Sequence, residues 1–188
     1  MNNDQVKRIT GVAVLLAIEI VLQAIGNYIT PGVLSINLSL IPIALGAILY
    51  GPLAGALLGF GNGLVVLLSP STEIFLSHSI FGTIVTCLLK CTIAGLLAGL
   101  IYKLIGKKNF LVGAVIASLA VPIVNTGLFV LAVFTIFFGL FQPIGSTDEI
   151  MKYVFLVMIG WNFIIEFVIT AILSPTIARV INIIKKEQ

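Results

Sequence analysis

Charged residues are scarce in this sequence. Asp, Glu, Lys and Arg together make up 9% of its 188 residues, whereas a soluble domain carries about 25%. Hydrophobic residues make up 60%, and the mean hydropathy is +1.23. Because so few charged residues cannot cover a water-facing surface, the composition predicts an integral membrane protein. The net charge of +3 comes from basic residues near expected helix ends, which favours membrane topology over nucleic-acid binding.

Residues for catalysis and metal binding are equally few. The chain has one His and two Cys, and Cys87 and Cys91 lie one helical turn apart in an apolar stretch. They lack companion metal ligands and have poor disulfide geometry, so we expect buried, inert thiols. There is no G-x-x-x-x-G-K-[ST], HExxH or GxSxG motif. We therefore expect no catalytic residue, no metal, no cofactor and no ATP hydrolysis by this chain.

Apolar segments recur along the chain and predict helices, because helices satisfy their own backbone groups in lipid. We expect one all-α domain, residues 1–188, a bundle of six transmembrane helices at about residues 9–29, 38–50, 53–68, 80–102, 111–140 and 153–183. The connections at 30–37, 69–79 and 141–152 are polar and are expected on the outer face.

The basic residues fall on one side of this arrangement. Eight of the ten lie together if both termini are cytoplasmic: Lys7, Arg8, Lys103, Lys107, Lys108, Arg179, Lys185 and Lys186. Lys and Arg concentrate in cytoplasmic loops of membrane proteins. The pattern therefore predicts cytoplasmic N- and C-termini.

Small residues repeat at helical spacing in two places. Gly51, Gly55, Gly59 and Gly63 occupy every fourth position, which favours close packing of two helices in lipid. They serve either packing inside the bundle or a docking or sliding face for another subunit. Ala13 and Ala17 likewise share a face of the first helix, on which we expect either a partner or ordinary packing.

Polar side chains inside the expected helices need an explanation, because ionisable groups are costly in the bilayer. Glu19, Lys90 and Glu166 each lie in a polar stripe at helical spacing. One interpretation is an outward-opening cavity in which Lys90 binds an anion and Asn62, Asn125 and Asn162 form hydrogen bonds. In the other, Lys90 pairs with Glu166 or Glu19 and the amides join helices.

Two further residues have two interpretations each. Trp161 either stacks on a ligand or anchors the last helix in the membrane interface, and His78 either caps a helix or contacts the ligand. The candidate substrate-binding residues are Asn62, His78, Lys90, Asn125, Trp161, Asn162 and Glu166.

The stretch INLSLIPIALGAILYGPLAGALLGF (residues 36–60), together with Ala13 and Ala17, resembles the substrate-binding S-components of energy-coupling factor (ECF) vitamin transporters. The resemblance spans the chain and implies capture of a vitamin at the outer face of a bacterial plasma membrane. It also implies docking, through Ala13 and Ala17, on a transmembrane coupling protein served by two ATPase subunits.

The segment VPIVNTGLF (residues 121–129) with Asn125 is similar to pantothenate-type members, so pantothenate is the favoured substrate. Riboflavin or another vitamin is the alternative. From the residues alone, a ligand-free membrane assembly subunit and a stand-alone carrier with Glu19 or Glu166 as proton site also remain open.

Overall fold

The computed structural model describes residues 3–29 and 37–186, and nearly all of this backbone is helical. The long helices are α1 (Asn3–Ile29), α5 (Ile80–Ile105), α6 (Phe110–Thr135) and α9 (Trp161–Lys186), and α2 (Leu40–Tyr50) and α3 (Pro52–Leu67) are shorter. No strand occurs in the described ranges. The predicted all-α class is confirmed. The connection predicted at 30–37 lies outside these ranges except for Asn37.

The chain contains three described helices that are long and apolar enough to cross a membrane: Gln5–Asn27, Ile80–Ile105 and Phe110–Thr135. A fourth span exists if Pro52–Leu67 and Pro70–His78, which meet at a 76° bend, count as one. The apolar helices Leu40–Tyr50 and Asn162–Ser174 are shorter. Length and composition therefore support three or four spans, and six stays a prediction.

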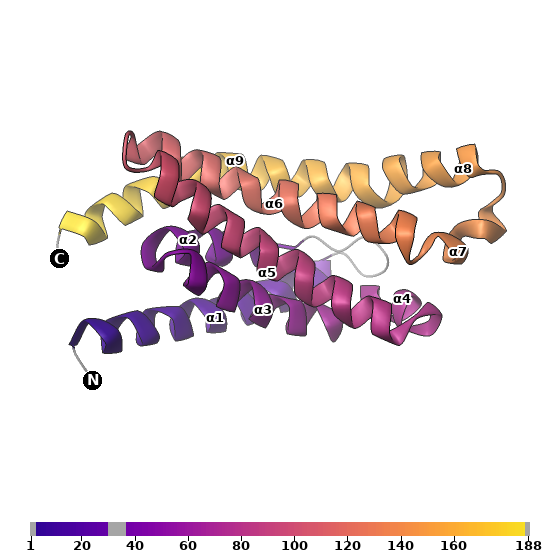
Figure 1. The fold of residues 1–188 in the computed structure, drawn as a ribbon, viewed down its shortest axis with the longest axis horizontal. Coiled ribbons are helices and arrows are strands. Elements are labelled where there is room, and N and C mark those ends of the chain that lie inside the picture. The colour runs from indigo at the N-terminus through magenta and orange to yellow at the C-terminus, as the bar shows by residue number, and fades with distance from the viewer. Residues whose placement is uncertain (1–2, 30–36, 187–188) are drawn as a thin grey trace.

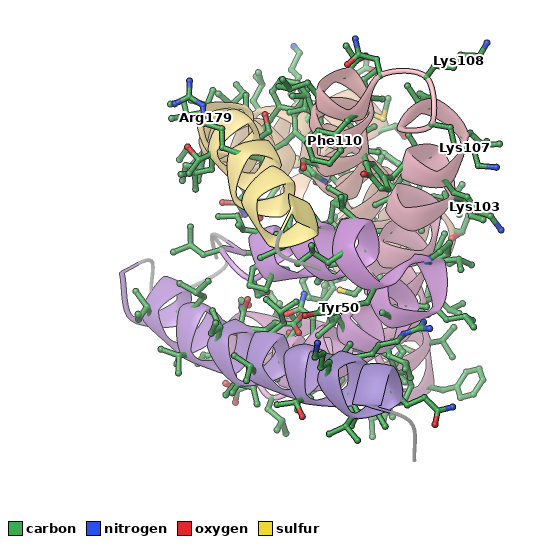
Figure 2. All side chains as sticks on the ribbon, turned by 90° about the vertical axis from the view of Figure 1, so that its left-hand side faces the viewer. Tyr50, Lys103, Lys107, Lys108, Phe110 and Arg179 are labelled. Carbon is green, nitrogen blue, oxygen red and sulfur yellow. The ribbon has the colours of Figure 1, made fainter. Side chains whose placement is uncertain are left out.

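The long helices run along the long axis of the molecule (Figure 1). Different elements of the chain therefore gather at its two ends. Both termini and the turn between α5 and α6 lie at one end, while α4 (Glu73–His78), α7 (Phe138–Phe141) and α8 (Thr147–Lys152) lie at the other. Figure 2 views the first end, where Lys103, Lys107, Lys108 and Arg179 surround the helix ends. We call this the basic end.

The end opposite the basic end is more helical than the sequence indicated. The stretch 69–79, expected to be a polar loop, forms η1 (Pro70–Thr72) and α4. The helix expected over 111–140 stops at Thr135 and is followed by α7, η2 (Gln142–Ile144) and α8, and the π-helix η3 (Tyr153–Gly160) precedes α9. Aromatic packing explains α4, because Phe75 is buried with its ring 5.1 Å from that of Phe137.

The glycine repeat packs α3 directly against α5. A Cβ atom on Gly55 would lie 2.4 Å from the carbonyl oxygen of Gly95, and one on Gly59 would lie 2.1 Å from that of Cys91. Gly63 makes a similar approach to Cys87. These glycines are buried in the bundle, so they form an internal contact and not a free docking face. We call this contact the glycine seam.

A second role belongs to Gly51, which connects α2 to α3. Its φ of 91° is a conformation that side chains disfavour, so glycine suits this turn. Pro52 follows at the start of α3, where its missing N–H breaks no helical bond. This turn lies at the basic end of the molecule, and after it α3 runs back alongside α2.

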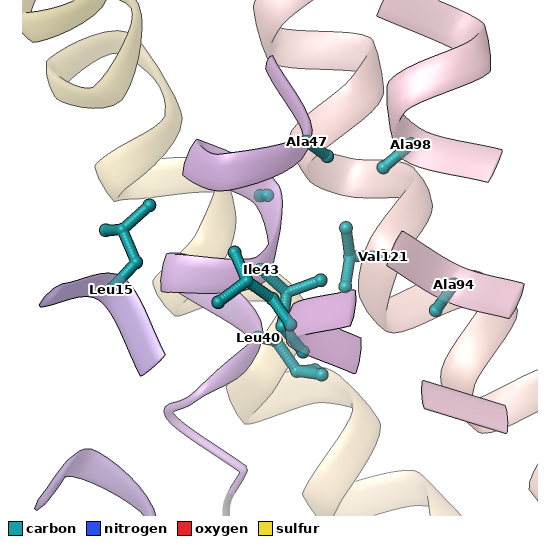
Figure 3. Close-up of a cluster of buried hydrophobic side chains, with 9 residues drawn as sticks. Leu15, Leu40, Ile43, Ala47, Ala94, Ala98 and Val121 are labelled. Carbon is teal, nitrogen blue, oxygen red and sulfur yellow. The ribbon is translucent and has the colours of Figure 1, made fainter. Parts of the chain in front are cut away.

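The apolar core surrounds α2. Figure 3 shows Leu40 and Ile43 of α2 packed among side chains of neighbouring helices, including Leu15, Ala94 and Val121. A separate aromatic cluster near α4 and α7 contains Phe75, Phe137 and Phe141. The candidate site lies between these two packed regions.

Candidate functional site

A cavity opens among the helices, with an empty volume of about 810 Å³ that includes solvent at its mouth. Its apolar wall includes Val66, Phe75, Phe129 and Phe137. Its polar lining comes from α1, α5, α6 and α9, from η1 and from the residue Asn37 before α2: Gln23, Asn37, Ser71, Thr72, Thr83, Thr86, Lys90, Asn125, Thr126, Asn162 and Glu166. Small-molecule sites combine apolar walls with placed polar groups, and this cavity has both.

Lys90 supplies the positive charge of this cavity. It is half-buried on α5, and its Nζ lies 4.9 Å from the centroid of the Phe129 ring. An ammonium is attracted to the face of an aromatic ring at this distance. No carboxylate of the described residues lies within ion-pair distance of Lys90. Its charge is therefore available to an anionic group in the cavity.

Glu166 supplies a negative charge from α9. It is buried, and its Oε1 accepts a hydrogen bond of 2.9 Å from the backbone N–H of Asn37. This bond fixes the carboxylate against the residue that precedes α2 by three positions. Lys90 and Glu166 are not within ion-pair distance of each other, but they are near enough to interact electrostatically across the cavity that both residues line.

The asparagines occupy two depths. Asn125 and Asn162 line the cavity, whereas Asn62 is fully buried and is not among the lining residues. Asn62 Nδ2 donates to Cys91 Sγ, and Cys91 Sγ donates to Asn125 Oδ1, each at 3.5 Å. Asn62 therefore supports the floor of the cavity through Cys91.

His78 lies apart from the cavity. It is exposed at the end of α4, and its ring centroid is 6.3 Å from that of Phe137, which does line the cavity. The side chain of Trp161 is outside those that the structure describes. Of the seven sequence-predicted residues, the structure gathers Lys90, Asn125, Asn162 and Glu166 around one space.

Several lining residues escaped sequence reasoning. Gln23 was visible as part of the polar stripe on the first helix, four residues after Glu19, but was not assigned to the site. Phe129 follows Asn125 by one helical turn, a spacing that places both on one face. Phe75 and Asn37 belong to segments expected to be loops, so periodicity gave no sign of their orientation.

The chemistry of the cavity is that of binding by charge and hydrogen bonds. Among the described residues, no three His, Cys, Asp or Glu side chains gather in one place. Transition-metal sites are built from such groups. The lining instead offers one ammonium, one carboxylate, amides and hydroxyls, which suits a small polar ligand.

The outer face of α1 is separate from this cavity. Ala13 and Ala17 are exposed, whereas Leu15, Glu19 and Gln23 on the other side of α1 are buried. Exposed Ile20, Val21, Ala24 and Ile25 continue this face and line a shallow hollow. The small-residue face of α1 is therefore not used for packing within the described bundle.

Comparison with known proteins identifies the family. The model of the ECF transporter substrate-specific component matches residues 7–178, a range that contains every residue named in the cavity lining. No curated protein and no solved structure matches the chain. The chain therefore belongs to the family of substrate-specific components of ECF transporters, which are membrane substrate-binding subunits for vitamins and not enzymes.

Proposed function

We propose that this chain captures pantothenate in the cavity and delivers it with an ATP-driven coupling module. The observation that carries the proposal is Lys90, a cation that lies over Phe129 in the cavity with no carboxylate of the described residues within ion-pair distance. Pantothenate is a small carboxylate with hydroxyls and one amide. Its carboxylate would bind Lys90, because hydrogen bonds between ionised partners are stronger than those between neutral ones.

The remaining groups of pantothenate find matching partners in the lining. Hydroxyl and amide N–H groups would donate to Glu166, and Asn125 and Asn162 would bind the other polar atoms. Asn62, His78 and Trp161 would not be needed for this mode.

Riboflavin is the second candidate because of the aromatic wall. Phe75, Phe129 and Phe137 offer apolar surface for a flat ring system, although Phe75 and Phe129 already contact each other edge to face at 5.6 Å. Riboflavin has no carboxylate to bind Lys90, so pantothenate uses the cavity more completely. A ligand-free assembly subunit is disfavoured by the family, whose members bind substrate.

The proposed placement in the bacterial plasma membrane has six spans with both termini in the cytoplasm. The basic end in Figure 2 supports it, because Lys and Arg concentrate on the cytoplasmic side. The cavity would then be reached from the outer face, beside α4 and α7. Ala13 and Ala17 would dock on the coupling protein, and two partner ATPases would hydrolyse ATP.

Isothermal titration of the purified chain with pantothenate and with riboflavin tests the proposal. We expect saturable binding of pantothenate without ATP, weakened more than about tenfold by Lys90→Met, since a charged hydrogen bond contributes about 1.5–3 kcal/mol. Lys103→Met is the matched control, because Lys103 is exposed on the same helix at the basic end.

Three outcomes would contradict parts of the proposal. Heat from neither vitamin would remove both assignments. Riboflavin binding alone would favour the second candidate. Equal pantothenate affinity in Lys90→Met and the unchanged protein would show that Lys90 does not bind the carboxylate.

A further inference from the structure

Four side-chain oxygens crowd together beneath the cavity. The hydroxyl oxygen of Ser39, immediately before α2, is 2.6 Å from Asn62 Oδ1 and 3.2 Å from Gln23 Oε1, and it also contacts Asn37 Oδ1. All four residues are buried. They come from α1, α3 and the segment at the start of α2. We call Gln23, Asn37, Ser39 and Asn62 the oxygen cluster.

One hydroxyl proton cannot satisfy three acceptor oxygens. If Ser39 donates to Asn62 at 2.6 Å, the oxygens of Gln23 and Asn37 face the Ser39 oxygen with no proton between them. Rotating the Gln23 amide so that its nitrogen and oxygen exchange places would break the hydrogen bond of 3.1 Å from Nε2 to Asn27 Oδ1. Turning Asn37 alone would still leave two acceptors, on Gln23 and Asn62, for one proton.

Glu19 adds a buried carboxyl group without a hydrogen-bond partner near this cluster. It precedes Gln23 by one turn on the same face of α1 and is completely buried. Among the described residues, neither carboxylate oxygen has a hydrogen-bond partner. Glu19 also lies near enough to Cys91, the partner of Asn62, to interact with it electrostatically.

Burial of a carboxylate without a partner requires that its charge be neutralised. A proton on Glu19 would remove the charge but would leave the oxygen cluster without a donor. A cation would balance the charge and attract the crowded oxygens at the same time. Amide, hydroxyl and carboxylate oxygens are ligands of hard cations.

We propose that the oxygen cluster and Glu19 form a binding site for a hard monovalent cation, Na⁺. A single carboxylate balances one positive charge, whereas a divalent ion would leave an excess charge in a buried, low-dielectric place. The cluster oxygens would provide the remaining ligands. The proposed Na⁺ site does not depend on which substrate the cavity binds.

The cation site adjoins the cavity through two shared residues. Gln23 and Asn37 belong to the cluster and also line the cavity. The backbone N–H of Asn37 holds Glu166, so a cation that orders Asn37 also orders this carboxylate. We therefore expect Na⁺ to raise the affinity for substrate by about fivefold or more, a part of the inference that rests on the proposed function.

Thermal unfolding of the ligand-free protein in detergent tests the site. NaCl should raise the unfolding temperature in a saturable way, and choline chloride at the same ionic strength should not, because a ligand of the folded state stabilises it. Ser39→Ala and Glu19→Gln should abolish the Na⁺ effect. Ser118→Ala should retain it, since Ser118 is equally buried but donates within α6 to Ala114.

The comparison of Na⁺ with choline in the unchanged protein needs no variant, so a variant that fails to fold does not prevent the test. Equal unfolding temperatures in the two salts would overturn the site.

Titration of pantothenate in NaCl and in choline chloride tests the coupling to the cavity. A Na⁺-dependent unfolding temperature with no binding of either vitamin would remove the proposed function and leave the cation site standing. Pantothenate binding without any Na⁺ effect on unfolding would do the reverse.

Discussion

The glycine seam and the cavity use opposite kinds of packing, although α5 takes part in both. In the seam, the backbones of α3 and α5 approach so closely that a single methyl group on Gly59 has no room. In the cavity, Thr86 and Lys90 of the same helix face open volume shared with α6 and α9. Helix α5 therefore makes backbone-to-backbone contact with α3 and also borders the cavity.

The lipid environment explains why α5 can pack closely against α3 and still border an open cavity. Helices in a bilayer gain little from hiding apolar side chains from each other, so association relies on close backbone contact. The seam supplies such contact along most of α3. Because the seam provides this contact, the helix faces around the cavity do not need to pack closely and can carry polar groups beside empty volume. We expect substitutions in the seam to change stability and substitutions in the cavity to change affinity.

The largest expected effect on stability is that of Gly59→Ala in the seam. The new methyl group would lie 2.1 Å from the carbonyl oxygen of Cys91, and overpacking of this kind lowers the free energy of unfolding by about 1–3 kcal/mol. Gly127→Ala is the matched control, because no atom lies within 4 Å of its added methyl. Unfolding of the two variants in detergent measures the difference.

Gly127→Ala should be neutral or stabilising by up to about 1 kcal/mol, since alanine is the better helix former. If both alanine variants unfold alike, the seam does not carry the stability that its geometry indicates, and the comparison fails.

A smaller effect is expected from Asn162→Ala in the cavity. Loss of one hydrogen bond to the ligand, worth about 0.5–1.5 kcal/mol, should weaken pantothenate binding by about twofold to thirteenfold. The unfolding temperature of the ligand-free protein should stay near that of the unchanged chain, because Asn162 is half-buried beside open volume. Titration and unfolding of one preparation test both parts. A large loss of stability with unchanged affinity would place Asn162 in packing instead.

The smallest effect concerns α8, outside both regions. Glu149 Oε2 accepts hydrogen bonds from the backbone N–H and the hydroxyl of Ser146, which lower the pKa of this exposed carboxyl. A lowered folded-state pKa gives stability that is present near neutral pH and is lost as the pH falls through that value. Glu149→Gln should therefore narrow the difference in unfolding temperature between neutral pH and pH about 3.5.

Glu73→Gln, which removes another exposed carboxylate at the same end, is the matched control for the loss of one negative charge. A Glu149→Gln variant with the full acid sensitivity of the unchanged protein would show that the bonds to Ser146 do not stabilise α8.

Much of the fold followed from the sequence. Helical periodicity and low charge predicted the all-α class, and Gly51-Pro52 predicted the turn between α2 and α3. The helix ends near 135 and the short helix α4 did not follow. They depend on the aromatic contacts of Phe75 and Phe137, which join segments more than sixty positions apart, and local periodicity carries no information about such contacts.

The candidate site was predictable only in part. The stripes placed Lys90, Asn162 and Glu166 on polar helix faces, and Asn125 was added as a single polar residue of another helix. The structure gathers these four around one cavity. Asn62 satisfied the same criteria and lies behind the cavity, bonded to Ser39 and Cys91. Spacing within one helix states which residues share a face, whereas the rotation of each helix against its neighbours decides which face meets the cavity.

The sequence alone determined that this is a helical membrane protein with buried polar stripes and a glycine repeat, because these properties depend on composition and on the 3.6-residue period. Only the tertiary structure decided that the repeat closes α3 onto α5, that Lys90 meets Phe129 and not a carboxylate, and that four oxygens crowd beside Glu19. Each of these depends on contacts between distant segments, and those are set by how the helices pack.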